Sequence, residues 1–207
     1  MSEQPTFFDL RRHPPTTKTI ALRIKESGPS AALDQAQLRA DAARYQEVTC
    51  RSALNPVKGM PFNWTLNPYR GCTHGCHYCF ARRYQTQFEL GPGDHFSSVI
   101  FVKTNFVQVL KHELDKPSWV KEQVAVGTAT DPYQPIEGQY KLTRGSIQAL
   151  LAARTPIGLV TKGPMVVRDK DVLAEQSERA ELSLGVAADL LAPDQPGADR
   201  GRDRPDG

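Results

Sequence analysis

Residues 123–161 read QVAVGTATDPYQPIEGQYKLTRGSIQALLAARTPIGLVT, and this stretch decides the fold. It begins and ends with short apolar runs, at 123–128 and 157–161, that are typical of buried strands. Between them, apolar side chains recur at helical spacing from Thr143, a residue that can cap a helix, to Arg154. Two strands joined by a helix are typical of a parallel sheet with a helical crossover. The stretch therefore predicts a β–α–β unit.

The same alternation continues on both sides of this unit. Upstream, the pattern predicts a strand at 62–66, a helix at 80–90, a strand at 98–103 and a helix that Asn105 caps. Downstream, it predicts a helix that begins at Asp169 or Asp171 and a last strand at 181–186. Strand and helix alternate about five times, which predicts an α/β fold with parallel strands.

The bulk composition is that of a soluble globular protein with one domain. The chain has 207 residues, and its net charge of +3 is too slight to argue for nucleic acid by itself. No apolar run approaches the roughly 20 residues that cross a bilayer, and the N-terminus does not resemble a signal peptide. We expect a cytoplasmic protein without membrane contact, in which cysteines are metal ligands or free thiols more readily than disulfides.

The chain divides into three parts by pattern. Residues 1–48 are polar and weakly patterned, which predicts a flexible N-terminal arm with a short helix near 34–45 at most. Residues 49–187 carry the strand–helix alternation and form the core. Residues 188–207 hold five Asp, three Arg, three Pro and three Gly, a composition that predicts a disordered tail.

Three cysteines, Cys72, Cys76 and Cys79, are spaced C-x3-C-x2-C, and Tyr78 precedes the last of them. Three thiolates can hold three corners of a four-iron cluster and leave the fourth iron open to a small molecule. Four protein ligands would close the site instead. The motif therefore favours catalysis over a purely structural metal site.

Zinc and free thiols are the alternatives for this motif. His74 or His77 could complete a tetrahedral zinc site with the three cysteines, although both lie inside the loop and would need strain to reach the same ion. Structural zinc fingers usually pair two CxxC-type elements, and the sequence has no second one. Cys50, 22 positions before Cys72, is either a small half-buried residue or a fourth ligand.

Each polar signature directly follows a predicted strand. The cysteine loop follows 62–66, a loop with two prolines and two acids follows 123–128, and Lys162 follows 157–161. In barrels and open parallel sheets, functional sites assemble at the C-terminal edge of the strands. We therefore expect the three segments to converge on one rim.

Lys162 and Asp131 each have a functional and an ordinary interpretation. Lys162 is either a surface lysine at a strand end or the partner of an anion, because an ammonium binds a carboxylate as a compact charge. Asp131 either contacts a ligand and orients its loop or simply stabilises a turn.

Residues 67–82, NPYRGCTHGCHYCFAR, resemble the signature of radical S-adenosylmethionine (SAM) proteins. The resemblance is closer to the branch related to spore photoproduct lyase, and within it to an actinobacterial group. Further matching stretches lie at 126–137 with 142–145, at 159–163 with 168–169, and at 52–55. The resemblance covers about residues 50–186, and the combination is more specific than any one motif.

The resemblance implies a partial (β/α)6 radical SAM barrel with about five strands over residues 49–187. It also implies that Cys72, Cys76 and Cys79 ligate a 4Fe–4S cluster whose open iron is chelated by SAM. An electron from an electron donor such as flavodoxin or ferredoxin would cleave SAM to methionine and a 5'-deoxyadenosyl radical. That radical would abstract hydrogen from an unknown substrate, with nucleic acid among the candidates.

The same resemblance assigns cofactor contacts outside the cysteines. Tyr78 would contact the adenine of SAM, Lys162 and Thr130 would lie near its carboxylate, and Asp131 would belong to the same loop. Thr128 is a departure, because the lyase branch carries there a cysteine that returns hydrogen to the product radical. Threonine cannot supply that hydrogen, so the sequence points away from DNA photoproduct repair and toward another lyase-like reaction.

The tail that begins after residue 187 stands where the resemblance implies a further barrel segment. We therefore expect a truncated or frameshifted chain with an open barrel edge. The alternative function is a non-catalytic metal-binding module, either a zinc site or an inactive cluster-binding remnant.

Overall fold

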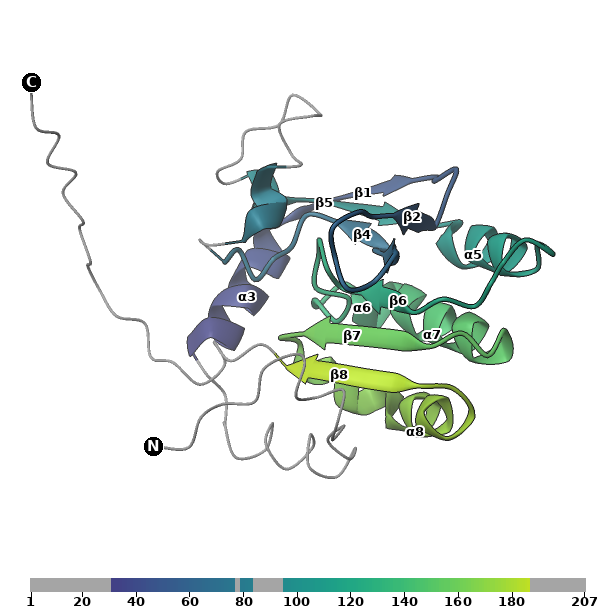
Figure 1. Ribbon diagram of the computed structural model, residues 1–207. Helices are drawn as coiled ribbons and strands as arrows, with labels where there is room; N and C mark the ends of the chain where they lie inside the picture. The colour runs from purple at the N-terminus through teal and green to yellow at the C-terminus, as the bar shows by residue number, and fades with distance from the viewer. Residues whose placement is uncertain (1–30, 77–78, 84–94, 187–207) are drawn as a thin grey trace, which may run out of the picture.

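The computed structural model describes residues 31–76, 79–83 and 95–186 (Figure 1). Tyr78, most of the predicted arm and the predicted tail at 188–207 lie outside the described residues. No helix within the described ranges is both long enough and apolar enough to cross a membrane.

The strands form two sheets. The larger sheet has the order β2 (Leu54–Pro56), β3 (Trp64–Leu66), β6 (Val124–Val126), β7 (Ile157–Thr161) and β8 (Leu182–Val186). The smaller has the order β1 (Arg44–Val48), β5 (Val99–Lys103) and β4 (Tyr69–Arg70). The strands from β3 to β8 in the larger sheet are parallel, and β2 joins them antiparallel.

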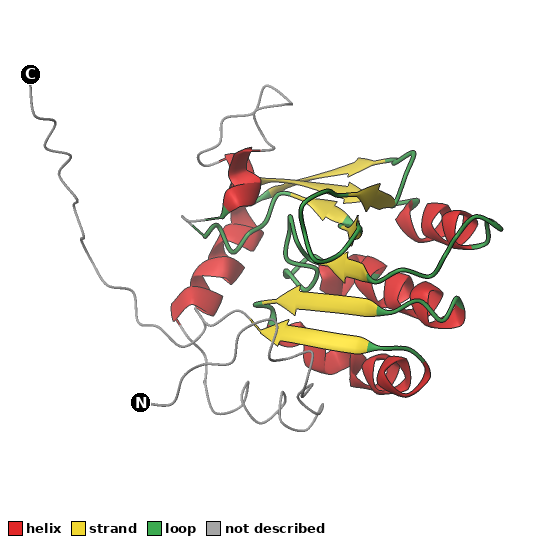
Figure 2. Ribbon diagram, in the orientation of Figure 1, coloured by secondary structure: helices red, strands yellow, loops and turns green. Residues whose placement is uncertain are grey.

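Three helices connect these strands as crossovers. They are α5 (Phe106–Leu114), α7 (Leu142–Ala152) and α8 (Lys170–Arg179). Figures 1 and 2 show the three lying side by side along one side of the larger sheet, where α7 packs against both neighbours. The short α6 (Glu137–Tyr140) and the 3₁₀ helix η2 (Pro164–Asp169) lie in the connections. The predicted β–α–β unit and the α/β fold class are confirmed.

The main core lies between the larger sheet and this row of helices. Its strand side chains include Leu66, Val126 and Leu159, and its helix side chains include Leu110 and Ile147, all fully buried. Burial of apolar area is the dominant favourable term in folding, at roughly 25 cal/mol per Å². The core therefore fixes the strand ends that carry the polar loops.

Two predicted helix caps are wrong in detail. Asn105 precedes α5 but makes no side-chain cap; its amide instead accepts the Cys50 N–H at 2.8 Å and donates to the Cys50 carbonyl at 2.9 Å. Thr143 lies inside the first turn of α7 and does not precede it. The Glu137 carboxylate accepts the free N–H groups of this turn, from Thr143 at 3.0 Å and from Arg144 at 3.2 Å. A buried acid thus replaces the cap.

The strand predicted at 98–103 is present as β5 but belongs to the smaller sheet, where it runs antiparallel to β4. The Cys72 N–H donates to the Phe96 carbonyl at 2.9 Å, so the chain turns back beside β4 instead of crossing over to β3. Residues 80–83 have 3₁₀ geometry, and the rest of the predicted helix at 80–90 lies outside the described residues.

Residues 31–48 also differ from the expected flexible arm. They form helix α3 (Ala31–Ala42) and strand β1, which pairs in parallel with β5. The predicted short helix is therefore present, displaced toward the N-terminus. Helix α3 packs against α4 (His95–Ser98), beside the cysteine loop.

The close approach of β4 and β5 predicts an asymmetry between two glycines. Gly71 has φ +80° and a Cβ there would lie 2.5 Å from the Val99 carbonyl oxygen, whereas Gly59 has φ +76° and open space. Gly59→Ala should cost only about 1 kcal/mol of backbone strain. Gly71→Ala should cost about 3 kcal/mol or more, since the clash adds to the strain.

Urea unfolding of both variants and the wild type measures this difference. Equal losses at the two positions would contradict the β4–β5 packing.

Candidate functional site

The site lies where the loops after β4, β6 and β7 meet. The Thr130 hydroxyl, in the loop after β6, donates to the Gly71 carbonyl at 2.6 Å, at the start of the cysteine loop. The backbone N–H of Lys162, directly after β7, donates to the Asp131 carboxylate at 2.6 Å. The predicted convergence of the three segments on one rim is therefore confirmed.

The Asp131 carboxylate holds two of these loops together. Its Oδ1 accepts the Thr161 hydroxyl at 2.7 Å and the Tyr133 N–H at 2.8 Å, while Oδ2 accepts the Lys162 N–H. Asp131 is only 8% exposed. A buried carboxylate with both oxygens engaged by the protein is a structural anchor, so the turn-stabilising interpretation describes what Asp131 does in this structure.

Gln134 ties the loop after β6 to the cysteine loop. Its amide nitrogen donates to the Gly71 carbonyl at 3.3 Å, and its amide oxygen accepts the Thr73 N–H at 3.2 Å. The side chain is fully buried. No local sequence pattern marks Gln134, although it lies four residues after Thr130 in the loop after β6.

Two arginines hold carbonyls of the cysteine loop from outside. Arg39, on α3, donates to the carbonyls of Thr73 and His74, each at 2.8 Å. Arg82 donates to the Cys76 carbonyl at 2.8 Å and stacks over the Phe96 ring. The loop is therefore fastened by its backbone, which leaves its side chains to determine its chemistry.

Two buried polar atoms of the loop have no hydrogen-bond partner within the described part of the chain: the Thr73 hydroxyl and His74 Nε2. His74 Nε2 lies 3.4 Å from Asp131 Oδ2, without hydrogen-bond geometry. Burial lowers the pKa of His74, and the nearby Lys162 charge lowers it further against the opposing effect of Asp131. Unpaired buried polar atoms are unusual and mark a place where a ligand or water can bind.

The three cysteines lie near one another but are not gathered around a point. Cys72 is buried with Phe96, and Cys79 packs on the same small cluster. Burial, with a further contribution from the nearby Asp131 charge, raises the pKa of Cys72 to about 12. Cys76 is half-buried. Among the residues that the structure describes, no three Cys, His, Asp or Glu side chains form a metal-binding group.

Cys50 lies apart from this loop. It packs against the main core, and its backbone is held by Asn105. The interpretation of Cys50 as a small, half-buried residue is therefore confirmed.

Two other residues of interest lie on the rim. Lys162 is half-buried, and its backbone N–H is bonded to the same Asp131 oxygen that lies 3.4 Å from His74 Nε2, so the residue stands beside the cysteine loop. Thr128, the departure from the lyase pattern, lies 3.4 Å from the side-chain nitrogen of Asn67. Asn67 also accepts the Ala129 N–H at 2.9 Å, so it joins the end of β3 to the loop after β6.

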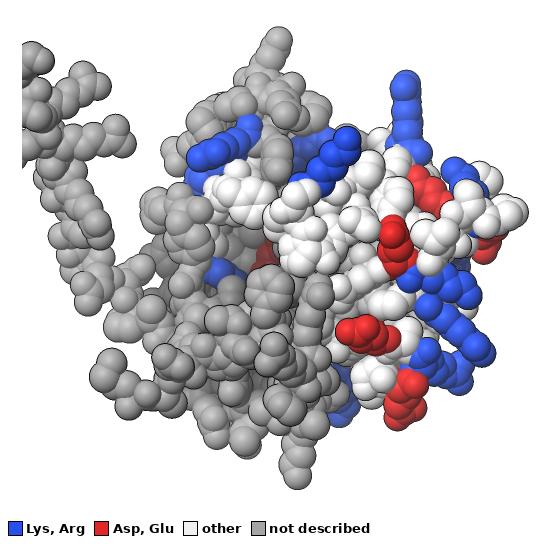
Figure 3. All heavy atoms as spheres, viewed as in Figure 1, with Lys and Arg blue, Asp and Glu red and all other residues white. Residues whose placement is uncertain are grey.

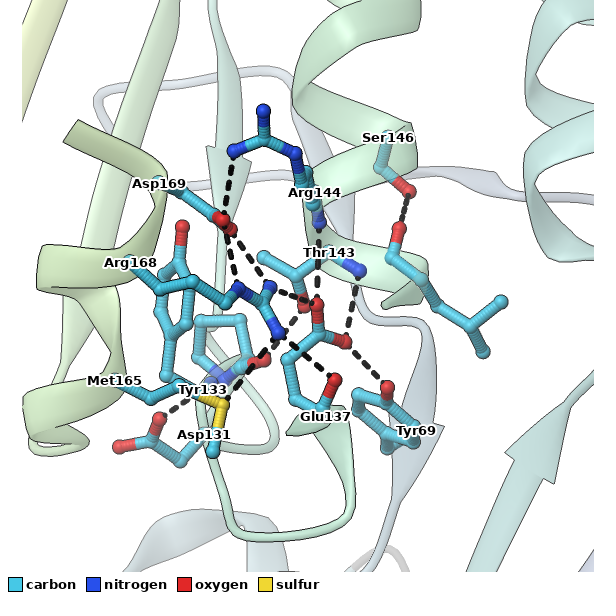
Figure 4. Close-up of polar contacts among 12 residues, drawn as sticks. Tyr69, Asp131, Tyr133, Glu137, Thr143, Arg144, Ser146, Met165, Arg168 and Asp169 are labelled. Carbon is cyan, nitrogen blue, oxygen red and sulfur yellow. Dashed lines mark hydrogen bonds and ion pairs between the residues drawn. The ribbon is translucent and has the colours of Figure 1, made fainter. Parts of the chain in front are cut away.

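A second polar cluster, centred on Glu137, Arg168 and Asp169, adjoins the rim (Figure 4). Arg168 binds Asp169 through two hydrogen bonds of 2.8 Å and Glu137 through one of 2.8 Å. Arg144 pairs with Asp169 at 3.0 Å and with the exposed Asp171 at 2.6 Å. Glu137, Arg144, Arg168 and Asp169 fall in the stretches that carry the resemblance, but no local signal there identifies them as partners.

The face of the molecule shown in Figure 3 carries charges of both signs among the described residues. Basic and acidic side chains both occur at its right-hand side. The distribution agrees with the small net charge of +3. A nucleic-acid partner therefore gains no support from this face.

Comparison with known proteins gives relatives without an assigned activity. Over 150 residues the chain is 46% identical to uncharacterized proteins of Mycobacterium tuberculosis and Mycobacterium bovis, a match that covers 71% of this chain and 44% of each relative. An uncharacterized protein of Methanocaldococcus jannaschii is 28% identical over 131 residues, covering 63% of this chain and 47% of that protein. The chain thus spans less than half the length of the curated relatives it matches.

No protein-family model matches the chain. No solved structure matches it either.

The engagement of both Asp131 oxygens predicts that Asp131→Asn is destabilising. Whichever way the amide is turned, its NH₂ group faces the backbone N–H of either Tyr133 or Lys162, and neither N–H can accept. The loss should be about 3 kcal/mol in urea unfolding. Asp41→Asn, at an exposed position of α3, should change stability by no more than about 0.5 kcal/mol. Equal effects would refute the anchoring role.

Acid stability should depend on the second cluster. Burial alone would raise the pKa of Asp169, but hydrogen bonds from Arg168 and Arg144 hold that pKa below its ordinary value. Arg144 likewise holds the pKa of Asp171 well below its usual range. The unfolded chain, with aspartate pKa near 4, then binds more protons below that pH.

The stabilisation from these acids is therefore fully present above about pH 5 and is lost as the pH falls below about 4. Unfolding free energies of the wild type and Arg144→Gln between pH 3 and 7 measure it. Arg144→Gln should show a shallower acid dependence, and identical slopes would contradict the assignment.

Proposed function

We propose that this chain is the cluster-binding part of a radical SAM enzyme. In this proposal the thiolates of Cys72, Cys76 and Cys79 hold a 4Fe–4S cluster and leave one iron open to SAM. The observation that carries the proposal is the position of the C-x3-C-x2-C loop. It is bonded to the loop after β6, which is in turn bonded through Asp131 to the end of β7.

The three cysteine thiols are the right chemical donors for the cluster, but they would have to move closer together to hold it. Three free thiols within eight residues are the right donors for an open-corner cluster. The unpaired polar atoms of Thr73 and His74 leave capacity for a ligand beside them. The thiols do not yet form a group, which is common for metal sites because binding completes the folding of the site.

When bound, the reduced cluster would supply the electron that cleaves SAM to methionine and a 5'-deoxyadenosyl radical. The chain's own residues would bind and orient the cofactor. Lys162 is suited to the SAM carboxylate, because the residue stands beside the cysteine loop through its bond to Asp131 and the buried rim strengthens charge pairing. Tyr78 keeps its proposed adenine contact from the family resemblance alone.

Thr130 and Asp131 take positioning roles in this proposal. The single O–H of Thr130 is donated to Gly71, so its oxygen can accept a hydrogen bond but has no proton left for a carboxylate. Asp131 would repel a carboxylate, and its oxygens already accept hydrogen bonds. Both residues hold the cysteine loop and the Lys162 loop in place.

A cytoplasmic enzyme of this kind needs an electron donor such as flavodoxin or ferredoxin and a substrate that yields a hydrogen atom. Thr128 argues against photoproduct repair, so the substrate differs from that of spore photoproduct lyase. The zinc alternative would need a fourth ligand, and His74, inside the same loop, would need strain to reach an ion held by the three cysteines.

Anaerobic reconstitution with iron and sulfide tests the proposal. The wild type should become brown, bind about four irons per chain and release 5'-deoxyadenosine from SAM after reduction. Cys76→Ala should lose both the cluster and SAM cleavage, whereas the matched Cys50→Ala should keep both, because Cys50 lies on the main core.

One zinc ion bound per chain, without a cluster, would refute the proposal and favour a zinc module. A stable cluster that never cleaves SAM would favour the non-catalytic remnant. Retained cluster in Cys76→Ala would refute the ligand assignment.

A further inference from the structure

The Glu137 carboxylate is fully buried and accepts four hydrogen bonds (Figure 4). Oε2 accepts the Tyr69 hydroxyl at 2.5 Å and the Thr143 N–H at 3.0 Å. Oε1 accepts the Arg144 N–H at 3.2 Å and the Arg168 guanidinium at 2.8 Å. Four acceptor sites are about the full capacity of a carboxylate, so no capacity remains for a ligand.

The donors to Glu137 come from both sides of the proposed SAM site. Tyr69 lies on β4, three residues before Cys72, and its side chain is 1% exposed. Arg168 lies on η2, which directly follows Lys162 and Gly163. The carboxylate therefore connects the strand that delivers the first cysteine to the loop that delivers the lysine.

Each of these connections is held rigidly. Arg168 also donates to the Glu137 carbonyl at 3.1 Å and binds Asp169 through two hydrogen bonds. A Cβ on Gly163 would lie 2.3 Å from the Tyr133 carbonyl oxygen, so the peptide after Lys162 is tightly enclosed. Neither side can shift without breaking buried hydrogen bonds.

We infer that Glu137 is a positioning residue that sets the cysteine loop relative to Lys162, through a Tyr69 arm and an Arg168 arm. This inference rests on the proposed function for its consequence, the affinity for SAM. The Tyr69 arm fixes how Cys72 is presented, and the Arg168 arm fixes where the Lys162 ammonium stands. Loss of the Tyr69 hydrogen bond should therefore disturb the cysteine loop alone. Loss of the Arg168 hydrogen bond should disturb the Lys162 loop alone.

Glutamine cannot replace this carboxylate. In one orientation its NH₂ group faces the Thr143 N–H, and in the other it faces both the Arg144 N–H and the Arg168 guanidinium. None of these groups accepts a hydrogen bond. Glu137→Gln therefore breaks at least one buried bond in either orientation. Tyr69→Phe and Arg168→Gln each remove one arm only.

The first experiment uses the apo chain and needs no cluster. Thiol alkylation followed by mass spectrometry gives the labelling rate of buried Cys72, with Cys50 as the internal reference. Glu137→Gln and Tyr69→Phe should raise the Cys72 rate about tenfold, whereas Arg168→Gln and the exposed Asp171→Asn should stay near the wild-type rate.

The second experiment uses the reconstituted chain. Glu137→Gln and Arg168→Gln should raise the KM for SAM about tenfold with unchanged iron content and little change in kcat. Tyr69→Phe should change this KM much less. Leu110→Ala, a core change on α5, serves as a control at a matched loss of melting temperature, because it destabilises the fold without touching either arm.

An unchanged Cys72 rate and SAM KM in Glu137→Gln would overturn the inference, as would equal effects in Leu110→Ala. If the proposed function is wrong, the wild type itself will bind no cluster. The labelling rates of Cys72 in the apo chain will still decide the role of Glu137.

Discussion

The arrangement of the rim depends on the buried carboxylate of Asp131. Short parallel strands end in peptide groups that the sheet no longer pairs, and a buried N–H without a partner is costly. Asp131 accepts two such N–H groups and the Thr161 hydroxyl, which holds the loops after β6 and β7 together. Glu137 does the same for the first turn of α7. The carboxylates of Asp131 and Glu137 therefore accept hydrogen bonds from the protein itself.

This use of the acids determines what the rim can offer a ligand. Besides Asp131, the rim carries the three thiols and the Lys162 side chain, together with the Thr73 hydroxyl and His74 Nε2, which have no hydrogen-bond partner among the described residues. That set is neutral to basic, so it suits a soft metal and an anionic group better than a hard cation such as Mg²⁺. The kinds of polar group at the rim, more than the fold class, favour the proposed cluster with a carboxylate-bearing cofactor.

Apolar periodicity predicted the parts of the fold that the main core dictates: β6, α7, β7, α8 and β8. Parallel pairing of β6 and β7 accounts for the meeting of two of the three loops. The cysteine loop was expected directly after the strand at 62–66, but it follows β4 of the smaller sheet and is joined to the loop after β6 by hydrogen bonds. The antiparallel return of β5 was not predictable, because it depends on the close approach at Gly71. The bonds of Glu137 to Tyr69 and Arg168 span 68 and 31 positions, so no local pattern reveals them.

The two halves of the cysteine loop are held by bonds of different strength. Cys72 is fixed by its N–H bond to Phe96, by the Gly71 carbonyl bonds and by burial. The half that leads to Cys76 is held through carbonyls by arginine side chains, and a Cβ on Gly75 would meet only side chains, Arg39 at 3.2 Å and Ser97 at 3.4 Å. Flexible side chains yield more readily than backbone. The backbone at Cys72 is therefore held by backbone contacts and burial, whereas the backbone near Cys76 depends on side chains.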